Sequence, residues 1–185
     1  MTGKMNKYIA FLRAINVAGH AKVKMNHLKQ VFGEAGCKNV RTYIQSGNVL
    51  FDAPERDIGS LIQEIQDKLC ELLGTESTVM YRTLHEIEDL MRTAPFKDIE
   101  TATDTKLYVT FLARKPARKP TLPLLSTKEA LEAVKLKNLE VYIISRKKKN
   151  GFYGFPNNFI EKEVGVPATT RNWSTITKIA KLLSG

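Results

Sequence analysis

The sequence predicts an α/β fold of the α+β type, with two tandem β-α-β-β-α-β units and extra linking and C-terminal helices. Two observations lead to this prediction. Strand and helix patterns follow that order through the first half of the chain, and the second half repeats much of it about one hundred positions later. The predicted organisation is a first unit over residues 1–83, a linking helix and connector over 84–105, and a second unit with the C-terminal helix over 106–185.

Hydrophobic periodicity defines each element of the first half. Residues 7–17 are apolar on both alternating faces, which is typical of a central strand covered on each side. Apolar residues at helical spacing follow, and Gly36 marks the end of that helix. The remaining elements are strand 39–46, a Gly47-Asn48 turn, strand 49–53, an amphipathic helix from Ile58 to Gly74 and a short strand 77–82.

The second half echoes the first. A capping-box pattern over 83–86 opens the linking helix, residues 97–105 are polar, and Tyr108–Leu112 then matches Tyr8–Leu12. Residues 166–170 make a poor strand, so the last strand of this unit is missing from the prediction. The other predicted elements are a short helix opened by the capping box 126–129 and running through Val134, strand 139–146, an Asn150-Gly151 hairpin leading to strand 152–155, helix 157–164 and a final helix that contains Trp173.

Composition indicates a globular protein with one basic half. The chain is 43% hydrophobic and 26% charged, and its net charge of +10 is concentrated in residues 96–185, which hold 17 Lys and Arg against 8 Asp and Glu. A basic half favours a polyanionic partner. No apolar run reaches the roughly 20 residues of a membrane span, and the N-terminus has no apolar signal core. We therefore expect a cytoplasmic protein with no membrane partner, in which Cys37 and Cys70 are free thiols.

The first candidate site lies at one edge of the first unit. In a β-α-β-β-α-β unit the first two strands run in the same direction, so the end of the first strand and the turn after the second strand emerge together. Unpaired N–H groups at the start of the first helix make that edge attractive to an anion. The alternative is that these residues only form and cap loops. The predicted ligand-binding residues here are Arg13, Asn16, His20, Ser46, Gly47 and Asn48.

The second candidate site is a basic loop edge of the second unit. The same geometry predicts that the loop after its first strand and the turn after strand 139–146 form one edge, which would suit nucleic acid. Phe152, Tyr153 and Phe155 would supply stacking, although they are also typical of a hairpin with core aromatic residues. The alternative for the charges is a pair of solvated loops. The predicted cations are Arg114, Lys115, Arg118, Lys119, Arg146, Lys147, Lys148 and Lys149.

The sequence gives little indication of a reaction. His20, His27 and His85 have no partner at metal-ligand spacing, so no metal is expected. The chain has neither a glycine-rich phosphate loop with Lys-Ser/Thr nor a nucleophile elbow. No cofactor is expected, and the residues leave open whether the protein is an enzyme.

Three segments resemble the signature blocks of a bacterial family catalogued as domain of unknown function 1697: Phe11–Val17, Tyr43–Val49 and Thr170–Thr175. Ala14 and Ala18 stand where the family usually has glycine. The resemblance covers nearly the whole chain and implies an α/β fold of two ferredoxin-like units. It implies no established activity.

The third block adds two residues to the first candidate site. Arg171 and Asn172 open the predicted last helix in a segment too polar for packing, and an arginine fork suits a carboxylate or phosphate. We expect both side chains to join Arg13 and its neighbours in a polar cluster between the halves. The alternative is a hydrogen-bond network that only fixes the halves together.

Two functions follow from these sites. The first is nucleic-acid binding through the basic loop edge, and the alternative is a site for an anionic metabolite, enzymatic or not, at the polar Arg/Asn/Ser cluster. A structural or partner-binding module is a third reading. The oligomeric state and the pathway are not indicated.

Overall fold

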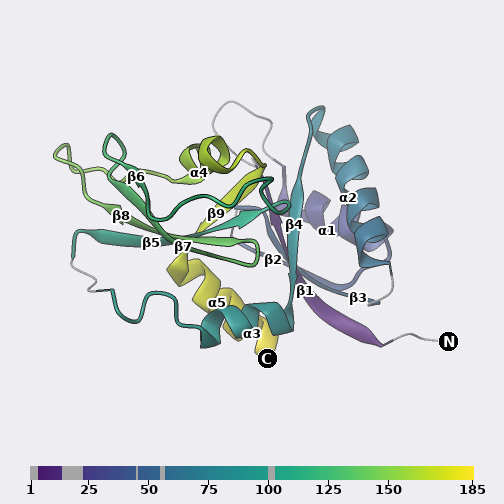
Figure 1. Cartoon of the computed structure of the whole chain (residues 1–185). Coiled ribbons are helices and arrows are strands. Elements are labelled where there is room, and N and C mark those ends of the chain that lie inside the picture. The colour runs from purple at the N-terminus through teal and green to yellow at the C-terminus, as the bar shows by residue number, and fades with distance from the viewer. Residues whose placement is uncertain (1–3, 14–22, 45, 55–56, 100–102) are drawn as a thin grey trace. The chain divides into compact units, whose positions relative to one another are not determined.

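The fold is mixed α+β, with two antiparallel sheets and, among the described residues, five helices (Figure 1). This computed structural model describes residues 4–13, 23–44, 46–54, 57–99 and 103–185. The chain divides into two compact units, one of residues 1–88 with 180–185 and the other of residues 89–179. No helix of the described ranges has both the length and the apolar character needed to cross a membrane.

The first unit has the connectivity of a ferredoxin-like unit. Its sheet has the order β2-β3-β1-β4, and each neighbouring pair is antiparallel. The elements are β1 (Met5–Leu12), α1 (Met25–Glu34), β2 (Lys38–Tyr43), β3 (Asn48–Pro54), α2 (Ile58–Leu73) and β4 (Val79–Thr83). Because β1 is a central strand, its apolar residues are buried on both faces, as their pattern predicts.

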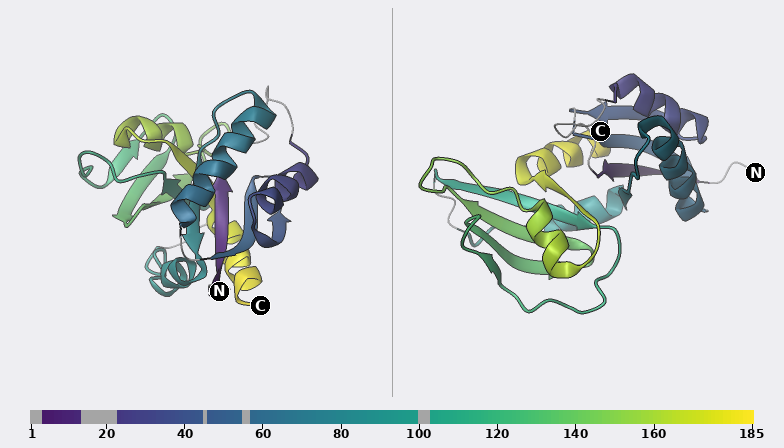
Figure 2. Two further views of the ribbon diagram at one scale, coloured as in Figure 1. Left: turned by 90° about the vertical axis from the view of Figure 1, so that its right-hand side faces the viewer. Right: turned by 90° about the horizontal axis from the view of Figure 1, so that it is seen from above.

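Both helices of the first unit cover the same face of its sheet (Figure 2). Tyr8, Ala10 and Leu12 alternate on that face of β1 and pack with buried residues of α1 and α2. The ring of Tyr8 stacks on that of Phe51, with centroids 5.4 Å apart, and Phe32 of α1 meets the same ring edge-on. These contacts form the core of the unit.

The predicted capping box at the start of α3 (Leu84–Arg92) is confirmed. The Thr83 N–H donates to Glu86 Oε2 at 2.7 Å, and the Glu86 N–H donates to Thr83 Oγ1 at 3.1 Å. Each side chain thus satisfies a backbone donor that the first helical turn leaves unpaired.

The second unit keeps the strand order of the first and adds one strand. Its sheet runs β6-β7-β8-β5-β9, so β7-β8-β5-β9 occupies the places of β2-β3-β1-β4. A loop and β6 stand where the first unit has its first helix. The elements are β5 (Thr105–Leu112), β6 (Leu124–Ser126), β7 (Leu131–Lys137), β8 (Glu140–Arg146), α4 (Asn157–Val164), β9 (Ala168–Asn172) and α5 (Trp173–Ser184).

The helix predicted to begin at Ser126 is wrong. The Glu129 N–H does donate to Ser126 Oγ at 3.3 Å, but the bond closes a turn. Ala130 then adopts a left-handed φ of +52°, which ends any helix, and Leu131 and Ala133 alternate as buried residues of β7. A local capping pattern was overridden by a two-residue periodicity that the prediction missed.

Two further predictions for this unit need correction. β9 forms at Ala168–Asn172, where the sequence predicts no regular strand, because its β-branched threonines pair with β5. The predicted strand 152–155 is reduced to a single bridge between Lys147 and Tyr153. Because β7 was predicted as a helix, the strand that the sequence places second in the unit is β8. This strand pairs with β5, as the third strand β3 pairs with β1 in the first unit.

Candidate functional site

The end of β1 and the β2–β3 turn lie together in the first unit. The Leu12 N–H donates to the Gly47 carbonyl at 2.8 Å, and Phe11 pairs with Asn48 in the sheet register. The turn is longer than the predicted Gly-Asn pair, since β2 ends at Tyr43 and Tyr43 pairs with Asn48. Of the other predicted residues at this edge, Asn16 and His20 lie outside the described residues, and Arg13 is half-buried.

Asn48 has a structural role in that turn. Its side chain is fully buried, and its amide nitrogen donates to the Tyr43 carbonyl at 3.0 Å and to Ser46 Oγ at 2.8 Å. Both amide hydrogens are therefore committed to holding the chain in its turn, where Gly47 has a left-handed φ of +72°. The role of these residues in ligand binding stays a prediction.

The predicted basic edge of the second unit is wrong as a single edge. β5 and β8 are antiparallel, with Phe111 opposite Glu140 and Thr105 opposite Arg146. The loop after β5 therefore leaves one end of the sheet and the 146–151 turn the other (Figure 2). An eight-residue strand separates the two ends by roughly 25 Å. The error arises because β7 was predicted as a helix. The turn that lies beside the end of β5 is the β7–β8 turn and not the 146–151 turn.

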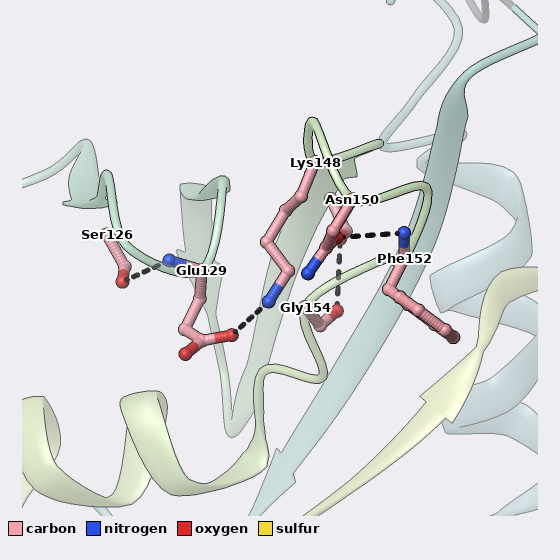
Figure 3. Close-up of polar contacts among 7 residues, drawn as sticks. Ser126, Glu129, Lys148, Asn150, Phe152 and Gly154 are labelled. Carbon is pink, nitrogen blue, oxygen red and sulfur yellow. Dashed lines mark hydrogen bonds and ion pairs between the residues drawn. The ribbon is translucent and has the colours of Figure 1, made fainter.

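Two of the four cations in the 146–151 turn are neutralised by glutamates. Arg146 Nη1 lies 2.8 Å from Glu132 Oε2. Lys148 Nζ lies 3.0 Å from Glu129 Oε2 (Figure 3). Lys147 and Lys149 are exposed. Of the predicted cations at this end, these two are left to meet an external anion.

The segment that follows is fixed by two hydrogen bonds and by a close approach of Gly154 to the β6–β7 turn. Ser145 Oγ donates to the Gly154 carbonyl at 3.0 Å, and the Phe152 N–H donates to Asn150 Oδ1 at 3.1 Å (Figure 3). A Cβ atom at Gly154 would collide with the carbonyl oxygen of Glu129. The hairpin of residues 146–155 is thus fixed in place by contacts that leave Phe152 and Phe155 exposed.

Two of those aromatic residues face solvent. Phe152 is 70% exposed and Phe155 is 59% exposed, although Phe155 still makes an edge contact with Tyr108 at 5.8 Å between ring centroids. The ring of Tyr153 lies 4.3 Å from Lys106 Nζ, which is a cation–π contact. The prediction that these residues are core aromatics therefore does not hold for the two phenylalanines.

Arg171 and Asn172 end β9, whereas the sequence places them at the start of the last helix. Arg171 is 7% exposed, and its guanidinium donates to Thr169 Oγ1 at 2.7 Å and to the Thr170 carbonyl at 2.8 Å. Burial lowers the pKa of Arg171 to about 10, so the side chain is still charged at neutral pH. Its predicted approach to Arg13 and the first-unit turn stays a prediction.

Asn172 lines a cavity of about 390 Å³ at the junction of β9 and α5. β5 extends beyond the end of its pairing with β9, which stops at Tyr108–Asn172, and the first residues of β5 border the space left there. Its lining residues are Thr105, Lys106, Leu107, Asn172, Trp173 and Ser174. The sequence offers a signal for Asn172 but none for Lys106, which stands in an ordinary strand pattern.

The architecture and these sites define a two-unit α+β protein whose second unit carries exposed cations and aromatic residues. The chain belongs to the family described as Protein of unknown function (DUF1697), whose model matches residues 5–142. Among solved structures it is similar to the conserved bacterial protein SP0830 from Streptococcus pneumoniae, with a TM-score of 0.67 and 20% identity over 97% of this chain and 99% of that one. At that identity the likeness shows the fold alone. No curated protein matches the chain.

Proposed function

We propose that the second unit binds single-stranded nucleic acid on the 146–155 hairpin. The observation that carries the proposal is the pair of exposed rings, Phe152 and Phe155, which follow the exposed Lys147 and Lys149 on the same hairpin. Aromatic side chains that face solvent beside cations are the means by which proteins bind single strands without reading their sequence. Each base stacked on such a ring contributes about 1–3 kcal/mol.

The charge arrangement supports weak, salt-sensitive binding. Arg146 and Lys148 are already paired with glutamates, so Lys147, Lys149 and the nearby Lys106 are the cations left for phosphates. Three phosphate contacts on a single strand predict a slope of roughly −2 in log K against log salt concentration. A dissociation constant of about 10⁻⁴–10⁻⁶ M at physiological salt is expected for binding of this kind.

The cations of the loop after β5 provide an internal control. Arg114 and Lys115 are exposed and directly follow β5, at the opposite end of the sheet from the hairpin. We expect a short oligonucleotide centred on the hairpin not to contact them, because the intervening strand is roughly 25 Å long.

The test is fluorescence anisotropy with labelled six-nucleotide DNA and RNA of mixed sequence at low salt. We expect Phe152→Ala and Phe155→Ala each to weaken binding at least fivefold, in line with the stacking energy of one base. Lys147→Gln with Lys149→Gln should weaken binding and flatten the salt dependence, whereas Arg114→Gln with Lys115→Gln should leave both unchanged. Absence of binding, or equal losses in both pairs of lysine and arginine variants, would refute the proposal.

A further inference from the structure

The cavity at the β9–α5 junction has the chemistry of a site for an anion that carries a flat apolar body. Among the residues that the structure describes, Lys106 is the one charged residue that lines it, and no described acidic side chain does so. Thr105, Asn172 and Ser174 add hydroxyl and amide donors, and Trp173 adds an indole surface. Its volume of about 390 Å³ lies within the range of roughly 300–1,000 Å³ found for small-molecule sites.

Two features of the surroundings narrow the class of ligand further. The indole of Trp173 is braced by Phe96, with an edge contact of 5.3 Å between ring centroids, so one part of the ring is held while the residue still lines the cavity. An immobilised indole is a good stacking surface for a nucleobase. A lysine ammonium is a compact charge that suits a phosphate.

Lys106 also connects the cavity to the hairpin. Its ammonium group lies 4.3 Å from the centroid of the Tyr153 ring, and Tyr153 stands between the exposed Phe152 and Phe155 in sequence. Lys106 thus lines the cavity while its ammonium group rests against the hairpin. A ligand phosphate at Lys106 would lie where a strand on the hairpin meets the cavity.

We infer that the cavity binds a nucleoside 5′-monophosphate, with the phosphate on Lys106 and Ser174 and the base against Trp173. The shared chemistry is a terminal phosphate joined to a base, which either a free mononucleotide or the 5′ end of a strand supplies. The second source rests on the proposed function; the first does not. Asn172 is positioned to donate to the sugar or base.

Trp173 is the only tryptophan of the chain, so its fluorescence reports on the cavity directly. Titration with uridine 5′-monophosphate, excited at a wavelength where uridine does not absorb, should change this fluorescence saturably. Uridine without the phosphate should bind at least tenfold more weakly. Lys106→Gln should abolish that tenfold preference, and Lys115→Gln at the far end of the sheet should retain it.

A second titration separates the two ligand sources. Six-nucleotide strands with a 5′-phosphate should bind at least threefold more tightly than the same strands with a 5′-hydroxyl, and Ser174→Ala and Lys106→Gln should reduce this difference. Phe152→Ala should weaken both strands equally and leave the mononucleotide unchanged.

The outcomes distinguish the inference from the proposed function. Strands that bind without a phosphate preference, together with a silent Trp173 in the mononucleotide titration, would overturn the cavity assignment and leave the hairpin proposal standing. A mononucleotide that binds through Lys106 while strands fail to bind would support the cavity and refute the hairpin proposal. A fluorescence change that is equal for uridine and its monophosphate would also overturn the assignment, because Lys106 would then have no role.

Discussion

Replacing Gly154 with alanine should loosen the 146–155 hairpin. The added Cβ atom would collide with the backbone carbonyl of Glu129, and a backbone atom cannot move aside as a flexible side chain can. Either the hairpin or the β6–β7 turn must shift. Such a shift would also stretch the bond from Ser145 Oγ to the Gly154 carbonyl and the ion pair between Lys148 and Glu129.

The magnitude follows from these three contributions. Overpacking by one methyl group in a tight site costs about 1–3 kcal/mol. Loss of the buried Ser145 hydrogen bond costs about 1 kcal/mol. The ion pair is partly exposed, with side-chain exposures of 25% and 37%, so it adds at most ~1 kcal/mol. The free energy of unfolding should therefore fall by about 2–5 kcal/mol.

Urea unfolding followed by far-UV circular dichroism tests this value against two other glycine-to-alanine changes. Gly151 has a left-handed φ of +84° but no crowding, so Gly151→Ala should cost about 1–2 kcal/mol through backbone strain alone. Gly33 lies in α1 with open space around it, so Gly33→Ala should be neutral or stabilise by up to ~1 kcal/mol. Neutral surface substitutions change the free energy of unfolding by up to about 0.5 kcal/mol. A change no larger than this for Gly154→Ala would mean that the close contact with Glu129 is not present in solution.

Four further predictions concern stability and reactivity. Burial raises the pKa of the Cys37 thiol to about 12 from an ordinary value of 9.0, so the native protein should react with a maleimide at the exposed Cys70 and not at Cys37, as peptide mass spectrometry would reveal. Between pH 9 and 12 the unfolded chain releases the Cys37 proton and the folded chain keeps it, so the free energy of unfolding should fall as pH rises, by up to ~1.4 kcal/mol per pH unit; Cys37→Ala should remove that component, and an unchanged slope would contradict it. Asn48→Ala should cost about 1–3 kcal/mol in thermal or urea unfolding, because two acceptors in the β2–β3 turn lose their donor, and a cost below 0.5 kcal/mol would argue against the buried amide. Thr83→Ala should cost about 1 kcal/mol by removing half of the α3 capping box, an effect that Glu86→Gln should largely spare and that equal losses in both variants would count against.

The first unit could be predicted from the sequence because each of its elements has a strong local pattern. The double-faced apolar run of β1 and the long amphipathic pattern of α2, closed by Gly74 with a φ of +64°, leave little choice of structure. The second unit could not be predicted as well. The Ser126-to-Glu129 bond forms in a turn as readily as at a helix start, so the local pattern does not decide between them. β9 depends on pairing with β5, which lies sixty residues away in the chain and leaves no local trace.

The candidate sites show the same division. Ser46, Gly47 and Asn48 could be placed beside the end of β1 from strand direction alone, because hairpin and crossover geometry fix it. The opposite ends of the two cationic loops could not be foreseen once β7 was read as a helix. The cavity beside Lys106 depends on how far β5 extends beyond the last residue that pairs with β9. The ends of strands are the least predictable feature of a sheet.

The extra strand β6 is short and leaves part of the outer edge of β7 without a described pairing partner. β6 pairs only with Leu131–Ala133, so no described strand continues along the outer side of residues 134–137. The register shifts between Ala133 and Lys135, and Lys135 and Lys137 are exposed on that stretch. An irregular strand bearing two ammonium groups is a poor template for a strand of another molecule. These two lysines thus disfavour edge-to-edge aggregation, independently of any role of the basic half in ligand binding.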